Sequence, residues 1–232
     1  MSLSWRTCGR YAFLAAAVVT ATLRMANAAD SADQNLLANG GMEQWQTDKL
    51  PTPGPNVPAI PNGVPVGWSV LQEAYERGDE PGFPIRGTVS RDAATTAGGE
   101  ASLHITNALT TDITEVSQGP LAAQPNAVYR VRCRVRGEKI APNSQDGCGA
   151  IVWANTGTGA PGDTRSGYQP LARTPAACTG SFDWQVFEFF AETGPEATWM
   201  RVALQLRRAS GEAWFDEVEV ACVAKVHPVD SY

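Results

Sequence analysis

The sequence has few positive side chains of the kind that bind nucleic acid. Among its 232 residues, 18 lysines and arginines stand against 24 acidic residues, so the formal net charge is −6 at pH 7. Only three of these cations are lysines, and no basic stretch is interleaved with aromatic residues. Affinity for DNA or RNA depends on many phosphate-neutralising cations, so this composition predicts a partner other than nucleic acid.

Side chains for acid–base or nucleophilic catalysis are also scarce. The sequence has two histidines, His104 and His227, and His227 lies among the last six residues. His104 alternates with apolar residues, which favours an exposed or polar-paired histidine on a strand over a catalytic base. A G-x-S-x-G nucleophile motif is missing, and adjacent acids such as Asp216 and Glu217 point to opposite faces of a strand. We therefore expect no enzymatic activity.

Long hydrophobic runs are missing except near the N-terminus. There the run Tyr11–Leu23 follows Arg6 and Arg10, and Ala26-Asn27-Ala28 supplies small residues at cleavage spacing. The run is 13 residues long, short of the ~20 that a membrane-spanning helix needs. It predicts a cleaved signal peptide over residues 1–28, with an uncleaved anchor as the alternative. The mature protein is then expected to be secreted, extracellular or periplasmic, with no membrane span.

Helical periodicity is missing from every stretch of ten or more residues. Short apolar segments are separated by clusters of glycine, proline, asparagine and serine, which predicts an all-β sandwich or barrel. The expected strands are 67–75, 87–91, 102–107, 128–136, 150–155, 184–191, 199–207 and 213–224. We expect one β-sandwich domain over residues 29–226 and a C-terminal tail over 227–232. The proline-rich segment 51–65 is expected to be a surface loop of this domain, with an interdomain linker as the alternative.

The segment Tyr129–Arg136 shows the clearest two-residue period. Its tyrosine, valines and cysteine occupy one face and its four arginines the other, so the apolar face is expected in the core. In the last strand Cys222 shares a face with Val218 and Val220. Both Cys133 and Cys222 are therefore expected to point inward.

Four cysteines remain once Cys8 leaves with the signal peptide. They form no C-x-x-C pair of the kind that binds zinc, and an even number outside the cytoplasm predicts two disulfides. Three pairings stay open. The shared inward face favours Cys133 with Cys222, which leaves Cys148 with Cys178.

An ordered series of short motifs runs along most of the mature chain. The motifs are Asn35-Leu-Leu-Ala-Asn-Gly-Gly-Met-Glu43, Pro65-Val-Gly-Trp68, Gly99-Glu-Ala-Ser-Leu-His-Ile105, Tyr129–Arg136, Asp183-Trp184 and Trp214-Phe-Asp-Glu-Val218. Together they resemble the CenC-type carbohydrate-binding modules and their galactose-binding-like relatives. The resemblance implies a jelly-roll β-sandwich of two antiparallel sheets, with Trp68, Trp184 and Trp214 in the core.

The resemblance also implies a structural calcium ion that holds the first strand to the last. The matching positions are Glu43 and Asp216, with backbone carbonyls near Asn39 and over 98–100 as further ligands. Calcium prefers oxygen ligands, which carboxylates and carbonyls supply. The alternative is that both acids are polar residues at strand ends.

A carbohydrate ligand is expected on the outer face of one sheet or at its edge. We expect that sheet to contain the strands 67–75, 128–136, 150–155 and 199–207. The candidate ligand-binding residues on its outer face are Glu73, Tyr75, Arg130, Arg132, Arg134, Trp153, Gln205 and Arg207. Aromatic rings beside polar side chains suit the apolar faces and hydroxyls of sugars. The alternative is an ordinary solvated outer face.

The expected function is non-catalytic binding of a polysaccharide or glycan. Arginines of two strands, expected to be neighbours with few acids among them, favour an acidic polysaccharide. Two alternatives remain, an extracellular structural domain that binds a protein partner and an accessory module that assists a separate glycoside hydrolase.

Overall fold

Strands form the regular structure of the residues that the computed structural model describes, which are 34–48, 50, 59–70, 87–143, 148–159, 169–173 and 177–225. The strands are β1 (Trp45–Gln46), β2 (Val64–Pro65), β3 (Ser69–Val70), β4 (Thr88–Asp92), β5 (Ser102–Asn107), β6 (Ile113–Ala122), β7 (Ala127–Pro142), β8 (Gly149–Gly157), β9 (Gln169–Arg173), β10 (Gly180–Glu192), β11 (Trp199–Arg207) and β12 (Ala209–Lys225). Across the described ranges, no helix is long and apolar enough to cross a membrane.

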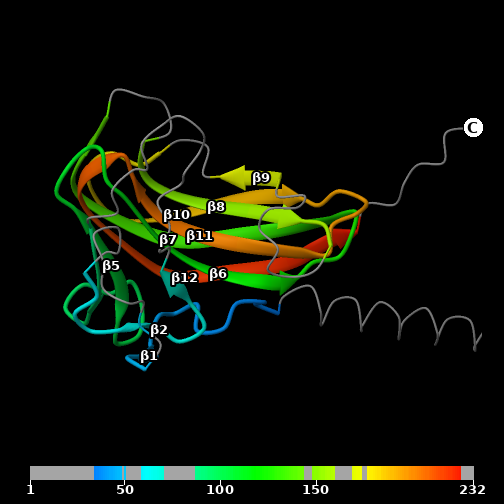
Figure 1. The fold of residues 1–232 in the computed structure, drawn as a ribbon, viewed down its shortest axis with the longest axis horizontal. Helices are drawn as coiled ribbons and strands as arrows, with labels where there is room; N and C mark the ends of the chain where they lie inside the picture. The colour runs from blue at the N-terminus through cyan, green and yellow to red at the C-terminus, as the bar shows by residue number, and fades with distance from the viewer. Residues whose placement is uncertain are drawn as a thin grey trace, which may run out of the picture.

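Ten of these strands build two five-stranded antiparallel sheets. The sheet that we call the β7 sheet has the order β10-β7-β12-β5-β4, and the β11 sheet has the order β3-β6-β11-β8-β9. The chain changes sheet at almost every step from β5 onward, and the long strands run along the length of the molecule (Figure 1). This is a jelly-roll β-sandwich, so the predicted fold class is confirmed.

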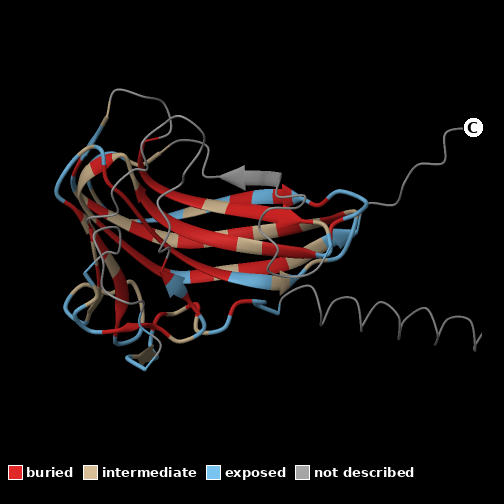
Figure 2. Cartoon of the chain, viewed as in Figure 1, coloured by how far each residue is buried: buried red, intermediate tan, exposed pale blue. Residues whose placement is uncertain are grey.

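The core lies between the two sheets, where alternate side chains meet. Tyr129, Val131, Cys133 and Val135 of β7 are at most 1% exposed, as their two-residue period predicted. Val202, Leu204 and Leu206 of β11 enter the same cluster from the other sheet. Buried residues follow the strands, whereas exposed residues gather where the strands end (Figure 2). Each fully buried valine or leucine side chain contributes ~1.5–3 kcal/mol to this packing.

The predicted composition of the ligand-binding sheet is wrong. We expected segment 128–136 to share a sheet with 150–155 and 199–207, but β7 pairs with β10 and β12, while β11 pairs with β6 and β8. Alternation along one strand shows which side chains point inward, but it does not show which distant strand becomes the neighbour. The arginines of β7 therefore lie on the outer face of one sheet, and Trp153, Gln205 and Arg207 belong to the other sheet.

Candidate ligand-binding site

The outer face of the β11 sheet carries a row of polar and aromatic side chains. Core residues alternate along its strands, so the intervening positions face away from the sandwich. In the register, Ala203 of β11 lies between Trp153 of β8 and Ser117 of β6. Two positions further along β11, Gln205 lies beside Glu115. Ala203 is 1% exposed, so the centre of this face is covered.

A buried ion pair fixes the centre of this face. Glu115 is 3% exposed at its side chain and Arg201 is 16% exposed. Arg201 donates through Nη2 to the Glu115 carboxylate and to Ser117 Oγ, the latter at 2.7 Å. Gln205 donates from Nε2 to the other oxygen of Glu115. The charge of Arg201 is thus balanced inside the protein.

Three neutral polar atoms on the same face lack a hydrogen-bond partner within the described part of the chain. They are Asn155 Oδ1, Gln205 Oε1 and Trp199 Nε1, and their residues are 2%, 5% and 2% exposed. An unsatisfied buried polar group costs ~1–3 kcal/mol. Buried polar atoms without a partner need an explanation. One explanation is a ligand that completes their hydrogen bonds.

Two tryptophans, Trp199 of β11 and Trp153 of β8, belong to this face. The Trp199 ring lies over Gly157 of β8, where a Cβ would come within 2.0 Å of the ring carbon Cζ2, so only glycine leaves room for the indole. Trp153 is partly exposed, and the Arg207 guanidinium carbon lies 5.6 Å from the centroid of its ring. This cation–π contact orients the Trp153 indole at the edge of the polar row.

The structure divides the predicted ligand-binding residues between the two sheets. Trp153, Gln205 and Arg207 come together on the β11 sheet, as predicted. Glu73 and Tyr75 lie outside the described residues, as do the predicted signal peptide and the C-terminal tail. Arg201 was expected on the outer face of the ligand-binding sheet, whereas Glu115, Asn155 and Trp199 were not among the predicted ligand contacts. The segment 113–118 carried little signal for Glu115, because Thr114 and Gln118 interrupt the alternation of polar and apolar residues and only Val116 separates Glu115 from Ser117.

The arginines of β7 are not crowded together without acids. Arg130 pairs with Glu219, and Arg134 Nε lies 2.6 Å from Glu217 Oε2. Arg132 lies between Glu188 of β10 and Glu219 of β12 in the register. The expected scarcity of acids on this face is therefore wrong, because β12 and β10 flank β7 and supply them.

The predicted calcium ligands Glu43 and Asp216 meet the same loop, residues 97–100. Both Glu43 carboxylate oxygens accept the amide of Glu100, at 3.0 and 2.9 Å. Asp216 Oδ2 accepts the amides of Ala97 and Gly98 at 2.9 and 3.2 Å, and its Oδ1 accepts that of Glu217 at 2.7 Å. The Asp216 side chain is fully buried, and this burial raises the pKa of its carboxyl despite the amide bonds that lower it.

These carboxylates do not form a calcium cage in their present arrangement. Each of the four carboxylate oxygens already accepts an amide hydrogen, and calcium wants six to eight oxygen ligands. Across the described residues there is no cluster of three or more histidine, cysteine or acidic side chains that could hold a metal ion. Hydrogen bonds from the loop thus connect the N-terminal segment and β12. The calcium site stays a prediction, for which a test is given below.

Neither predicted disulfide is present, and the four described cysteines are free thiols. Cys222 lies opposite Tyr129, four residues along β7 from Cys133, which corresponds to ~13 Å at the rise of a strand. A disulfide requires Cα atoms within ~7 Å, so the register excludes this pair. Cys178 pairs with Ala150 through two hydrogen bonds of 3.0 Å rather than with Cys148. Burial raises the pKa of Cys178 to about 11.

The comparison with solved structures matched carbohydrate-binding modules at low sequence identity. No protein-family model matches the sequence, and the comparison with curated proteins found no match. The CBM22-1 xylan-binding domain of Paenibacillus barcinonensis Xyn10C is 15% identical, with a TM-score of 0.46 over 84% of this chain and 99% of that one. TmCBM61, solved with β-1,4-galactotriose, is 16% identical, with a TM-score of 0.43 over 82% and 99% of the two chains.

A phage enzyme domain is a further structural neighbour. The enzymatically active domain of bacteriophage CBA120 tailspike protein 4 is 9% identical, with a TM-score of 0.48 over 81% of this chain. The match spans only 21% of the tailspike chain. These matches do not confirm the CenC-type family in particular. At such identities and TM-scores they carry no ligand or activity over to this chain.

Proposed function

We propose that this protein binds carbohydrate without catalysis, through the outer face of the β11 sheet. The observation that carries the proposal is the set of three unpartnered, buried, neutral polar atoms on Asn155, Gln205 and Trp199. Two of them accept hydrogen bonds and one donates. A ligand that satisfies them must both donate and accept, which is the property of a sugar hydroxyl.

The neighbouring aromatic ring supports the same ligand class. Sugars present apolar C–H faces as well as hydroxyls, and Trp153 offers a partly exposed indole beside the polar row. Pockets that bind small molecules combine such apolar surface with a few fixed polar groups. Arg201 holds its position through Glu115 and Ser117, so the polar row is rigid before a ligand arrives.

The charge balance favours a neutral sugar over the acidic polysaccharide expected from the sequence. Arg201 is neutralised by Glu115, and the unpartnered amide oxygens of Asn155 and Gln205 are acceptors that an anion cannot satisfy. An acidic ligand was expected because the arginines were expected to lie together with few acids among them. Glu219 and Glu217 pair with Arg130 and Arg134, so this reason for an acidic ligand does not hold. Export through the signal peptide remains part of the proposal, because the protein would encounter polysaccharides outside the cytoplasm.

A glycan array followed by calorimetric titration tests the proposal. The probes are xylohexaose, cellohexaose and β-1,4-galactotriose, together with the strongest glycan of the array. Trp153→Ala and Gln205→Ala should each lower the affinity at least tenfold. Trp184→Ala and Gln185→Ala are matched controls on β10 of the other sheet and should leave this affinity unchanged. Full binding by both β11-sheet variants, or no binding of any glycan by the wild type, would refute the proposed site.

A further inference from the structure

Arg136, on the outer face of the β7 sheet, is held in place by an aromatic ring. In the register it lies beside Trp214 of β12, which in turn lies beside His104 of β5. The Arg136 guanidinium carbon lies 4.7 Å from the centroid of the Trp214 ring. The His104 and Trp214 rings stack in parallel, with centroids 4.4 Å apart and an angle of 4° between the planes.

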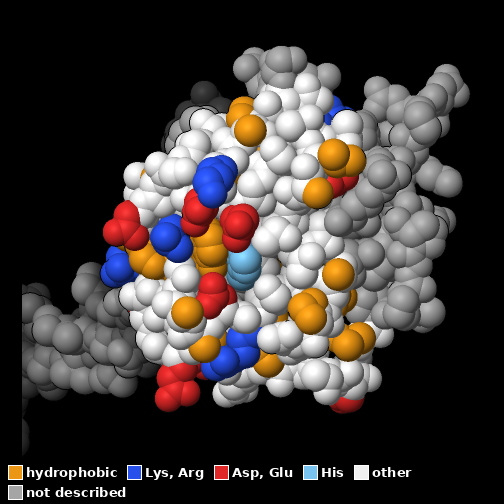
Figure 3. All heavy atoms as spheres, turned by 90° about the vertical axis from the view of Figure 1, so that its left-hand side faces the viewer, with side chains coloured by type: hydrophobic (Ala, Val, Ile, Leu, Met, Phe, Trp, Pro, Cys, Tyr) orange, Lys and Arg blue, Asp and Glu red, His pale blue; other side chains and the backbone are white. Residues whose placement is uncertain are grey.

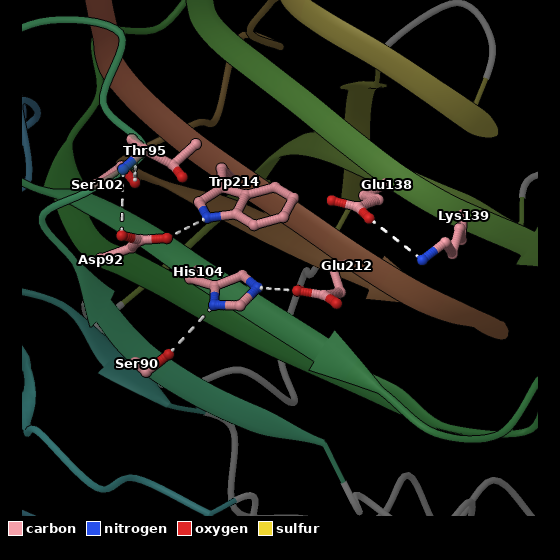
Figure 4. A network of polar contacts seen from close by, with 9 residues as sticks. All are labelled: Ser90, Asp92, Thr95, Ser102, His104, Glu138, Lys139, Glu212 and Trp214. Atoms are coloured by element: carbon pink, nitrogen blue, oxygen red, sulfur yellow. Dashed lines mark hydrogen bonds and ion pairs between the residues drawn. The ribbon is translucent and has the colours of Figure 1, made fainter.

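Polar contacts immobilise this stack from below and from the side. Trp214 donates from Nε1 to Asp92 Oδ2 at 2.8 Å (Figure 4). The His104 Nε2 atom lies 2.9 Å from Glu212 Oε2, and Ser90 Oγ lies 3.4 Å from its Nδ1. Trp214 is only 4% exposed, so its ring acts as a fixed support and not as a free binding platform. Figure 3 shows this end of the molecule, with acidic and basic side chains around the one described histidine.

Arg136 makes a longer ion pair than its neighbours Arg130 and Arg134 on β7. Arg130 and Arg134 make close ion pairs with Glu219 and Glu217. Arg136 has only a distant one, 3.9 Å from its Nε to Asp183 Oδ1, and the Asp183 side chain is 93% exposed. Among the described residues no hydrogen bond involves its guanidinium. The donors of a rigidly positioned arginine are therefore available to a ligand.

A hollow of about 490 Å³ opens beside this arginine. It is lined by Arg136, Gly137, Glu138, Ser181, Phe182 and Asp183. The β7–β10 register shifts on both sides of the Gly137–Phe182 pair, which shapes the hollow. A Cβ at Gly137 would come within 2.5 Å of the Phe182 ring, so glycine allows the ring to lie against β7. The volume is within the range of small-molecule sites.

The groups around the hollow match a neutral sugar ring. Arg136 can donate to hydroxyl oxygens, whereas the Glu138 and Asp183 carboxylates can accept from hydroxyl hydrogens. Phe182 is partly exposed and packs against the hydrophobic core, and it supplies the aromatic side chain of the lining. The two acids outnumber the one cation of the lining, which disfavours an anionic ligand. An isolated carboxylate or sulfate would meet repulsion from both acids.

We propose that this hollow, which we call the Arg136 hollow, is a second sugar-binding site on the sheet opposite the first. The ligand class rests on the proposed function, while the location rests on Arg136 and Phe182. A single glycan chain cannot lie along both outer faces of one sandwich. The protein would therefore be bivalent and would connect two polysaccharide chains.

Titration and turbidity measurements test this proposal. The wild type should bind the neutral oligosaccharide probes named above at two sites per chain and should make a solution of the matching polysaccharide turbid. Arg136→Gln and Phe182→Ala should each reduce the number of sites to one and abolish the turbidity. Arg134→Gln is a matched control on the same face of the same strand and should leave both sites intact. Arg136→Lys, which keeps the charge but loses the planar fork, should weaken the second site at least fivefold. Trigalacturonate should bind the Arg136 hollow more weakly than galactotriose.

The outcomes separate the two sites. If Arg136→Gln and Phe182→Ala bind and cross-link like the wild type, the second site is wrong and the proposed function stands. If Trp153→Ala binds like the wild type while Arg136→Gln loses all binding, the site on the β11 sheet is wrong and the Arg136 hollow stands. A wild type that binds one sugar per chain overturns the second site, and one that binds none overturns both. Melting temperatures within a few degrees of the wild type show that each variant folds.

Discussion

Arg201 on β11 donates to Glu115 on β6 across the face that we propose to bind sugar, and both side chains are largely buried. The register sets Gln205 of β11 opposite Glu115. Arg201 lies directly beside Gly119 of β6, whose absent side chain leaves room for the arginine stem. The pair supplies no net charge to a ligand. Its contribution is to hold Ser117 and Gln205 in fixed positions, since each is hydrogen-bonded to one member of the pair.

Removal of Arg201 should destabilise the fold strongly. Arg201→Ala leaves the buried Glu115 carboxylate without its cationic partner and with only the Gln205 hydrogen bond, and breaking a buried ion pair in this way costs about 3–5 kcal/mol. Arg134→Ala breaks an ion pair whose side chains are 37% and 44% exposed, and such a pair contributes less than ~1 kcal/mol. Urea denaturation of both variants measures the difference. Equal losses would show that the Glu115 environment is not a buried one.

Asn155 should contribute to sugar binding but little to the stability of the fold. Its Oδ1 has no partner within the described residues, so Asn155→Ala removes an unsatisfied atom and should change the free energy of unfolding by less than ~1 kcal/mol. The affinity for sugar should fall at least tenfold. Asn107→Ala is the matched control, because Asn107 is equally buried but donates to Leu206 and Ala209 and accepts from Thr114. That variant should lose ~3 kcal/mol or more. A similar loss for both asparagines would argue against the proposed role of Asn155.

Local alternation predicted much of the fold and about half of the candidate site. The two-residue period of Tyr129–Arg136 placed Val131 and Val135 in the core because side-chain direction depends only on the strand itself. The partner strands of β7 depend on contacts between residues far apart in sequence, and no local pattern contains them. Trp214, assigned to the core by resemblance, lies on the outer face beside Arg136, because an aromatic residue can be buried by neighbouring side chains as well as by the opposite sheet.

The four described thiols should be reduced and should differ in reactivity. With a pKa of about 11, Cys178 is a thiolate in only about one molecule in a thousand at pH 8, so it should react slowly with iodoacetamide. Cys133 is fully buried and should be protected until the protein unfolds. Cys222 is partly exposed and should be labelled first in the native protein. Mass spectrometry after labelling in denaturant should find all four modified. Recovery of only two labelled cysteines would instead support a disulfide between Cys148 and Cys178.

A chelator tests the calcium prediction directly. Glu43 and Asp216 already accept backbone amides of the 97–100 loop, so this connection does not depend on an ion. We expect EDTA to leave the melting temperature unchanged within about 2 °C, because a ligand stabilises a fold only when it binds the folded state. Glu43→Gln should lower the melting temperature with or without EDTA, since it weakens the bonds to the Glu100 amide. A fall of several degrees in EDTA, reversed by added calcium, would establish the ion at this place and show that the amides give way to it.

Burial of Asp216 should make stability depend on pH in a defined direction. Its carboxyl is fully buried, and desolvation raises its pKa above the ordinary value of 3.8, against the lowering effect of the Ala97, Gly98 and Glu217 amides. Below this value the side chain is protonated in the folded and the unfolded chain. As pH rises, the unfolded chain loses the proton first, so the folded state binds more protons and its stability falls until the folded carboxyl has ionised.

Asp216→Asn isolates this contribution because asparagine does not titrate in the same range. The difference in free energy of unfolding, wild type minus variant, should decrease as the pH rises above the ordinary pKa of 3.8 and should level off once the folded carboxyl has ionised. Urea denaturation at several pH values measures it, with Asn107→Ala as a variant that is buried but carries no acid. A difference that grows with pH would mean that the three amide hydrogen bonds outweigh desolvation and that the folded carboxyl is the stronger acid. In that case the 97–100 loop would hold Asp216 chiefly through its charge, and the variant should be least stable relative to the wild type at neutral pH.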